Sequence, residues 1–186
     1  EMGMKRLPFF FISTWLLFLT TAAVSEIDFQ IGWQIKGEGG FSAVNTLNDP
    51  EKGLCLVATE VNDGVVCIDV KGDIFWTFPL TAPVTATPAV SDVDGDHLEE
   101  IVAADAAGRL VVLNHDGTLL WETVLPAGVS AASCPAVADI NGDGKVEIIV
   151  GDVSGTVSCL DNKGKGIWRF TGDGTQMGPV LIHDIY

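Results

Sequence analysis

The sequence predicts an all-β fold made of repeated four-stranded antiparallel sheets, and three observations support this. Segments 88–121 and 135–168 match almost without gaps at a spacing of 47 residues. Within each segment, short runs rich in valine, isoleucine and leucine alternate with turns of Asp, Asn and Gly. After residue 25, no stretch shows a convincing helical period.

Each copy is predicted to form four short strands. In the first complete copy the predicted strands are 88–91, 100–104, 110–114 and 119–124. A degenerate copy lies upstream at 54–76, and a further copy begins at Gly178. The repeat units are therefore expected at about 36–79, 80–125 and 126–171, with the start of the next at 177–186.

Four antiparallel strands that recur every 40 to 50 residues are typical of β-propeller blades, since one such sheet cannot cover both of its own apolar faces. The chain supplies three to four blades after its N-terminal segment, whereas a closed ring usually takes about four to eight. We therefore expect a partial β-propeller.

The N-terminal segment predicts export. Lys5 and Arg6 precede the apolar run 7–24, which ends in small residues before Glu26. This pattern is typical of a secretory signal peptide spanning residues 1–25. The alternative is an uncleaved membrane anchor through residues 7–24. Either way, the remaining chain is expected to be secreted, periplasmic or displayed on the cell surface.

The charge balance restricts the partners. The chain has 25 acidic residues against 10 basic ones, a formal net charge of −15. Such a charge repels phosphate backbones and anionic lipid surfaces, so binding to nucleic acids is not expected, nor is binding to membranes beyond the N-terminal segment. Cations are the natural partners.

Two acidic loops are candidate calcium sites. The sequences DVDGDHLEE (92–100) and DINGDGKVE (139–147) place oxygen donors at positions 1, 3, 5 and 9, with a glycine at position 4. Calcium prefers six to eight hard oxygen ligands, and the backbone carbonyl at position 7 would add a neutral one. The predicted ligands are Asp92, Asp94, Asp96, Leu98 and Glu100 in the first loop, and Asp139, Asn141, Asp143, Lys145 and Glu147 in the second.

The two loops differ in charge. The first carries four carboxylates and the second three, so the first is expected to bind calcium more tightly if the geometries match. Neither loop is an EF-hand, because the closing glutamate starts a strand instead of lying at position 12 between helices. Two alternatives remain: ordinary acidic turns, or a magnesium site.

These motifs resemble known repeats. Segments 92–102 and 139–150 are similar to FG-GAP/VCBS-type calcium-binding propeller repeats, and 67–76, 112–121 and 159–168 resemble the Trp-bearing strands of PQQ-like propeller repeats. The resemblance covers residues 30–186 and implies a propeller with calcium, but no quinone cofactor, since the chain lacks adjacent cysteines. Residues 45–53 depart from the pattern because they lack the acids of the loop.

Three other sets of residues are interpreted as structural. One tryptophan per copy at the same strand position predicts packing between blades, rather than a sugar-stacking surface. These residues are Trp33, Trp76, Trp121 and Trp168. Asp105 and Asp152 are expected to cap tight turns. Cys55 and Cys67 flank a predicted hairpin turn and are the pair most suited to a disulfide, with buried thiols as the alternative.

No catalytic motif is present, with neither a zinc-binding H-E-x-x-H nor a G-x-S-x-G nucleophile turn. The leading hypothesis is a calcium-binding module that binds or scaffolds an unidentified extracellular protein or glycan, without catalysis in this segment. The alternatives are the N-terminal propeller of an extracellular enzyme, such as a polysaccharide lyase, and a cell-envelope assembly factor.

Overall fold

The structure, a computed structural model, describes residues 41–60, 64–129, 133–175 and Ile182. The chain divides into two units, Glu1–Ile35 and Lys36–Tyr186, and all described residues belong to the second. The predicted signal segment, Trp33 and the copy that begins at Gly178 lie outside the described residues. Within the described part, no helix has the length and apolar character needed to cross a membrane.

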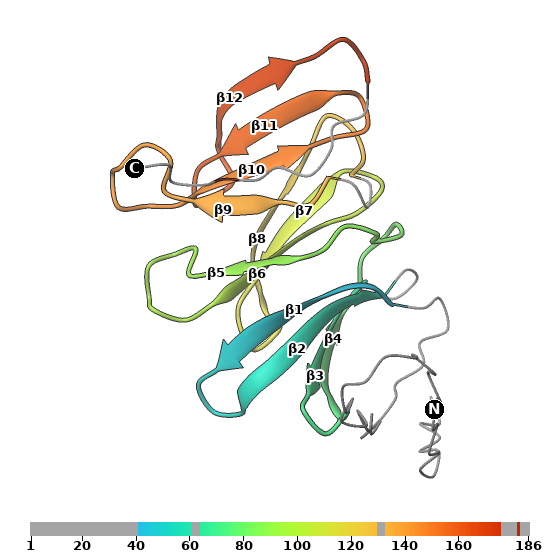
Figure 1. Cartoon of the computed structure of the whole chain (residues 1–186), viewed down its shortest axis with the longest axis vertical. Helices are drawn as coiled ribbons and strands as arrows, with labels where there is room; N and C mark the ends of the chain where they lie inside the picture. The colour runs from blue at the N-terminus through green and yellow to red at the C-terminus, as the bar shows by residue number, and fades with distance from the viewer. Residues whose placement is uncertain (1–40, 61–63, 130–132, 176–181, 183–186) are drawn as a thin grey trace, which may run out of the picture. The chain divides into compact units, whose positions relative to one another are not determined.

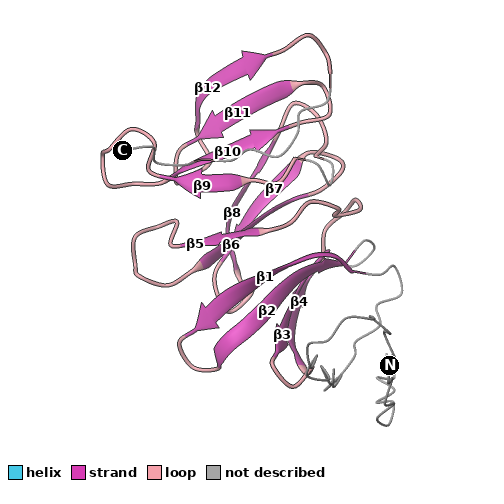
Figure 2. Cartoon of the chain, in the orientation of Figure 1, coloured by secondary structure: helices cyan, strands magenta, loops and turns pink. Residues whose placement is uncertain are grey.

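Within these described ranges, twelve strands form three four-stranded antiparallel sheets, each in the order of the chain (Figures 1 and 2). The first sheet comprises β1 (Phe41–Asp49), β2 (Gly53–Glu60), β3 (Gly64–Asp69) and β4 (Ile74–Phe78). The second comprises β5 (Ala89–Ser91), β6 (Glu100–Ala104), β7 (Arg109–Leu113) and β8 (Leu119–Val124). The third comprises β9 (Ala136–Ala138), β10 (Glu147–Gly151), β11 (Thr156–Leu160) and β12 (Gly166–Thr171).

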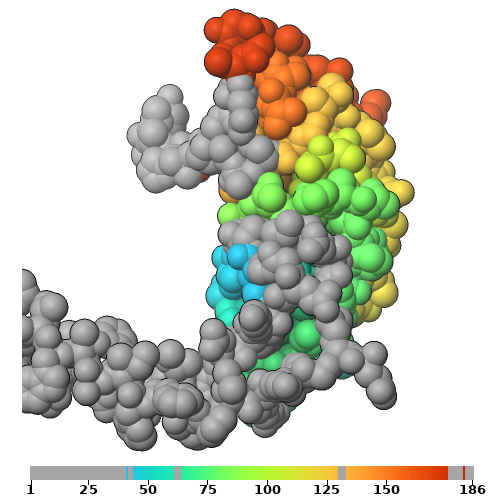
Figure 3. All heavy atoms as spheres, turned by 90° about the vertical axis from the view of Figure 1, so that its right-hand side faces the viewer, coloured from blue at the N-terminus to red at the C-terminus, as the bar shows by residue number. Residues whose placement is uncertain are grey.

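This architecture confirms the predicted all-β partial propeller. The strands of the second sheet begin and end within one residue of the predicted bounds, because apolar runs and turn residues are local signals. In Figure 3 the colours from cyan to red show the three sheets following one another in the order of the chain. Each sheet corresponds to one blade.

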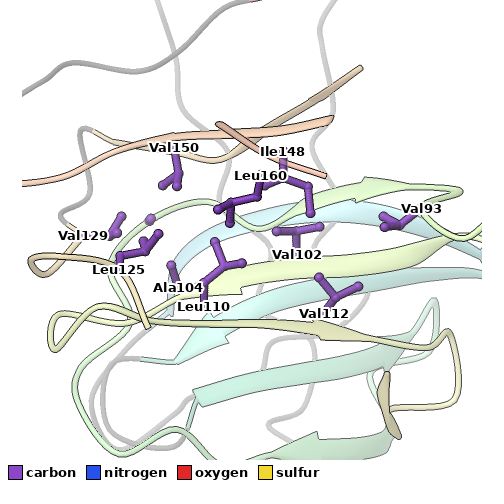
Figure 4. Packing of buried hydrophobic residues seen from close by; sticks show 11 residues of the cluster. Val93, Val102, Ala104, Leu110, Val112, Leu125, Val129, Ile148, Val150 and Leu160 are labelled. Atoms are coloured by element: carbon purple, nitrogen blue, oxygen red, sulfur yellow. The ribbon is translucent and has the colours of Figure 1, made fainter. Parts of the chain in front are cut away.

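The apolar cores lie between consecutive sheets. Side chains alternate along β6: Ile101 and Ala103 join a cluster with the first sheet, whereas Val102 and Ala104 join a cluster with the third. Figure 4 shows the second cluster, in which Ile148 and other third-sheet residues face the second sheet. Because both faces of the second sheet are covered, all five residues of β6 are buried.

Tryptophans on the fourth strands join the sheets, as predicted for Trp76 and Trp121. The Trp76 indole Nε1 donates a hydrogen bond to the His115 carbonyl oxygen at 3.1 Å, and Trp121 Nε1 donates to the Asn162 carbonyl oxygen at 3.0 Å. Each indole thus spans from one sheet to the turn between the third and fourth strands of the next. Trp168 differs, since 44% of its surface is exposed and no further sheet follows it in the described residues.

The prediction of a disulfide between Cys55 and Cys67 is wrong. Both are free, buried thiols. The strand register pairs Cys55 with Asp69 and Cys67 with Val57, so the two cysteines are diagonal neighbours rather than direct cross-strand partners. Burial raises the pKa of the Cys67 thiol to about 12, which keeps it protonated and unreactive at neutral pH.

Candidate metal centre

The first acidic loop connects β5 to β6 and brings its four predicted acidic ligands together. One carboxylate oxygen from each of four residues lies within 4.8 Å of the others. These residues are Asp92, Asp94, Asp96 and Glu100. Among the residues that the structure describes, no other group of three or more acids, histidines or cysteines gathers in this way.

Backbone amides orient the first carboxylate of the loop. Asp92 Oδ1 accepts a hydrogen bond from the Gly95 amide at 2.7 Å, and Asp92 Oδ2 accepts one from the His97 amide at 3.0 Å. The loop therefore wraps around Asp92. Bending the chain this sharply places His97 at φ 72°, a conformation that residues other than glycine rarely adopt.

Glu100 closes the other end of the loop from the first position of β6. Its side chain is buried, at 1% exposure, and Oε2 accepts the Val93 amide at 2.7 Å and the Asp94 amide at 3.4 Å. Burial, together with the negative charges of Asp94 and Asp96, raises the pKa of Glu100 above its usual value, although the Val93 amide opposes the shift. A buried carboxylate beside other acids is costly unless it is protonated or a cation neutralises it.

The second loop connects β9 to β10 and repeats the same hydrogen bonds in register. Asp139 accepts the amides of Gly142 and Gly144 at 2.7 and 2.8 Å, and Glu147 Oε2 accepts the Ile140 amide at 3.0 Å. The Gly144 amide is the main reason that the pKa of Asp139 is lowered. The two loops therefore share one local structure, with Gly144 at the position of His97.

The second loop differs in how its donors converge. Asn141 turns its amide Nδ2 toward Glu147 Oε1, which accepts a hydrogen bond at 2.9 Å. The carboxylates of this loop form no close group of the kind seen in the first loop within the described residues. The loop instead borders a cavity of about 300 Å³ that Lys145 and Lys163 also line. The structure thus brings the first set of predicted ligands together more closely than the second.

The backbone carbonyls predicted at position 7, those of Leu98 and Lys145, remain predictions. Their amides are engaged, because Leu98 donates to Asp96 Oδ1 at 2.7 Å and Lys145 donates to Asp143 Oδ1 at 2.9 Å. These contacts bend the loop after position 5 in both copies. In each loop, one oxygen of the carboxylate at position 5, Asp96 Oδ1 or Asp143 Oδ1, is therefore held by a backbone amide.

Two contacts of the first loop with neighbouring sheets were not predicted. Glu99 Oε2 accepts the Asn48 amide of the first sheet at 2.7 Å, and Val93 is buried in the cluster shared with the third sheet. Neither contact has a signal in the local sequence, since each depends on residues of another sheet. The first loop is therefore held by contacts with both the first and the third sheet.

The sequence profile of the lambda-carrageenase beta-propeller domain matches residues 55–126 and 136–184, which together make up more than half of the chain. Lambda-carrageenases from Pseudoalteromonas sp and Pseudoalteromonas carrageenovora are each 32% identical to this chain over 69 residues. That alignment covers 37% of this chain but only 7% of each relative.

Solved structures support the fold alone. Yeast (Saccharomyces cerevisiae) Sqt1 aligns with a TM-score of 0.65 and 15% identity over 82% of this chain and 44% of its own. The Vibrio cholerae biofilm matrix protein Bap1 has a TM-score of 0.59 and 18% identity over 83% and 24%. BamB from Moraxella catarrhalis has a TM-score of 0.55 and 17% identity over 75% and 39%. On the profile match, the chain belongs to the lambda-carrageenase beta-propeller domain family.

Proposed function

We propose that this chain is an extracellular propeller module whose first acidic loop binds calcium, and whose role is to bind or scaffold rather than to catalyse. The observation that carries the proposal is the approach of four carboxylate oxygens to within 4.8 Å of one another. Four negative charges at such distances repel strongly, and a divalent ion would turn that repulsion into binding energy.

The donor set fits calcium in number and kind. Four carboxylates, the carbonyl of Leu98 and water can supply the six to eight hard oxygens that calcium prefers. Asp92 and Glu100 are already oriented by backbone amides, so part of the ordering cost is met by the fold. Within the described residues, the contact between the His97 ring and Asp92 offsets little of the negative charge. The two side chains are 3.7 Å apart, and that of His97 is 96% exposed.

Calcium in this position would stiffen the module. The loop contacts the first sheet through Glu99 and the third through Val93. An ion that fixes the loop would therefore also stabilise the positions of its neighbours. We expect added calcium to raise the melting temperature, since a ligand that binds only the folded state stabilises it by mass action.

The test is a reciprocal exchange at position 3 of the two loops, followed by calorimetric titration with calcium chloride. Asp94→Asn gives the first loop the amide of the second, and Asn141→Asp gives the second loop the acid of the first. We expect Asp94→Asn to weaken the first site about tenfold, about 1.4 kcal/mol, and Asn141→Asp to strengthen the second.

The matched control is Asp116→Asn, which removes an exposed acid from the turn between β7 and β8. It has the same net charge as the Asp94→Asn variant. It should leave calcium affinity unchanged. Heat of binding that is absent in the unmodified protein, or equal in all variants, would show that the loops are ordinary turns. Parallel titration with magnesium chloride distinguishes the competing ion.

A second candidate is that this module is part of an extracellular enzyme that degrades a polysaccharide, and the family match favours it. The relatives at 32% identity are named for cleavage of lambda-carrageenan. Electrophoresis of the chain through gels containing lambda-carrageenan tests this directly. Retardation relative to gels without polysaccharide supports a substrate-binding role, whereas equal mobility leaves the module as a scaffold.

A further inference from the structure

The second acidic loop contains the only Asn–Gly pair of the sequence, Asn141–Gly142. Every other asparagine is followed by threonine, aspartate, histidine or lysine. The backbone nitrogen after an asparagine can attack the side-chain amide carbon and form a five-membered imide, and a side chain on the attacking residue hinders this step. Glycine has no Cβ, so its nitrogen approaches freely. This pair is therefore the place in the chain where the chemistry is least hindered.

The structure holds the two reacting groups close together. Asn141 Oδ1 accepts the Asp143 amide at 2.9 Å, so the asparagine side chain folds back along the chain that follows it. The side-chain carbon thereby stays next to the Gly142 nitrogen, and the hydrogen bond polarises the carbonyl toward attack. Gly142 has φ 77°, and a Cβ built on it would meet no atom within 4 Å. An imide ring thus has room to form.

The hydrogen atoms that must move already face carboxylates. The Gly142 amide, which loses its proton in the attack, donates to Asp139 Oδ1 at 2.7 Å. The Asn141 Nδ2 group, which leaves as ammonia, donates to Glu147 Oε1 at 2.9 Å. The proton of the attacking nitrogen therefore has an acceptor beside it, and the leaving group is directed away from the backbone.

We propose that Asn141 is a site of spontaneous deamidation in the folded protein. The Gly142 nitrogen bonds to the side-chain carbon of Asn141, the bond from that carbon to Nδ2 breaks, and the proton lost by the nitrogen leaves with the amide as ammonia. Water then adds to either carbonyl of the imide and opens it. The products carry aspartate or isoaspartate at position 141, with one more negative charge and no other co-reactant than water.

The surroundings of Asn141 suit both the second step and its product. Its side chain lines the open cavity of about 300 Å³, so water reaches the imide. Lys145 and Lys163 line the same cavity, and neither forms an ion pair within the described residues. The new carboxylate therefore gains two cationic neighbours, which favour its charged form.

The aspartate product makes the second loop chemically equal to the first at its acidic positions. Position 3 becomes an acid, as at Asp94, and the hydrogen bond from Nδ2 to Glu147 is lost. This consequence rests on the proposed calcium function: deamidation would then strengthen calcium binding at the second loop with the age of the protein. The modification itself does not depend on calcium.

Peptide mapping by mass spectrometry tests the modification in the full-length folded protein. The protein is incubated at body temperature in mildly alkaline buffer with EDTA, and each asparagine peptide is followed for the gain of a single mass unit. We expect Asn141 to convert about tenfold faster than Asn114 and Asn162, because only Asn141 precedes a residue without a side chain. Conversion of Asn141 no faster than these two internal controls would overturn the proposal.

A synthetic peptide covering residues 136–150 separates the influence of the fold from that of the sequence. Conversion in the peptide but not in the protein would show that the folded loop protects Asn141, and would also overturn the proposal. The product must include isoaspartate, since an imide opens at either carbonyl, and aspartate alone would exclude the cyclic step. Asn141→Gln is the matched control, because its longer side chain cannot form the five-membered ring and should stay unmodified.

Calorimetric titration with calcium chloride tests the consequence separately. Protein aged until the aspartate form can be isolated should bind calcium like the Asn141→Asp variant and more tightly than fresh protein. Conversion without any change in the heat of calcium binding would refute the link to calcium while supporting the modification. Failure of the modification and failure of the calcium proposal are therefore distinguishable.

Discussion

The connection between the first two strands differs between the first sheet and the other two. In the first sheet, β1 runs for nine residues and pairs with β2 up to Asp49 and Gly53, so the connection is a tight hairpin. In the second and third sheets, the first strand has three residues and an eight-residue acidic connection follows, at 92–99 and 139–146. The connection between the first and second strands of the repeat is thus a tight hairpin in one sheet and an acidic loop in the other two.

The hairpin and the acidic loop surround their buried carboxylates with different partners. Asp49 accepts the Glu51 and Lys52 amides at 2.9 and 2.8 Å and lies 3.1 Å from His115 Nδ1 of the second sheet. Glu100 accepts amides but also faces other acids. The hairpin carboxylate therefore has hydrogen-bond partners from the protein itself, whereas the acidic loop gathers four carboxylates close together.

The largest effect is expected from Glu100→Ala. Removing the carboxylate leaves the buried Val93 amide without its acceptor and opens a cavity, so the free energy of unfolding in EDTA should fall by about 3 kcal/mol. Urea denaturation measures the change. Glu100→Gln is the matched control, because it keeps an acceptor; a loss as large as that of the alanine variant would show that charge, and not the hydrogen bond, matters.

The next effect concerns the hairpin, where Asp49→Asn should cost about 1.5 kcal/mol by weakening the contact with His115. Burial by itself would raise the pKa of Asp49, but hydrogen bonds from His115 and from the Lys52 and Glu51 amides leave it below 3.8.

The sign of the pH dependence follows from that lowered pKa. A carboxyl with a lowered pKa in the folded state stabilises the protein above its unfolded pKa, and this contribution is lost as the pH falls through the folded value. The difference between Asp49→Asn and the unmodified protein should therefore shrink below about pH 4. Thermal unfolding from pH 7 to pH 3 measures this difference.

Asp69→Asn is the control, since Asp69 also accepts turn amides but contacts no histidine within the described residues. Equal losses of stability in both variants would show that His115 contributes nothing.

A smaller effect, with a sign that depends on calcium, is expected from Asp94→Asn in the acidic loop. In EDTA the substitution removes one of the charges that raise the pKa of Glu100, so it should stabilise the protein by about 1 kcal/mol. In saturating calcium it should destabilise the protein, because a ligand is weakened. Melting curves in both conditions measure the two signs, and the same sign in both would argue against a metal at this loop.

The smallest effect compares the two acidic loops at position 6. His97 has φ 72° where the second loop has Gly144 at φ 83°. His97→Gly should relieve backbone strain and stabilise the protein by about 0.5 kcal/mol, after the entropic cost of glycine is included. Gly144→Ala is the reciprocal change and should destabilise, although no atom lies within 4 Å of the added Cβ. Thermal unfolding of both variants provides the comparison, and no difference between them would indicate that position 6 tolerates any residue.

Much of the fold could be predicted from local sequence. The strands β5 to β8 and the turns at Asp105 and Asp152 follow from apolar runs and turn residues, and Asp105 Oδ1 indeed accepts the Ala107 and Arg109 amides. The candidate site was only partly predictable. The ten proposed ligands could be named. The hydrogen bond from Asn141 to Glu147, by which the second loop differs from the first, depends on side-chain orientation and not on spacing.

The sequence by itself determined the repeat, the antiparallel strands and the positions of the acidic loops, because these depend on residues close together in the chain. Only the tertiary structure decided that Asp49 meets His115, 66 residues away, and that the indole of Trp76 donates its hydrogen bond to the carbonyl of His115. It also decided which loop gathers four carboxylates and which tryptophan remains exposed. The physical reason is that these contacts form only when one sheet packs on another, and their individual partners depend on side-chain positions that no local pattern encodes.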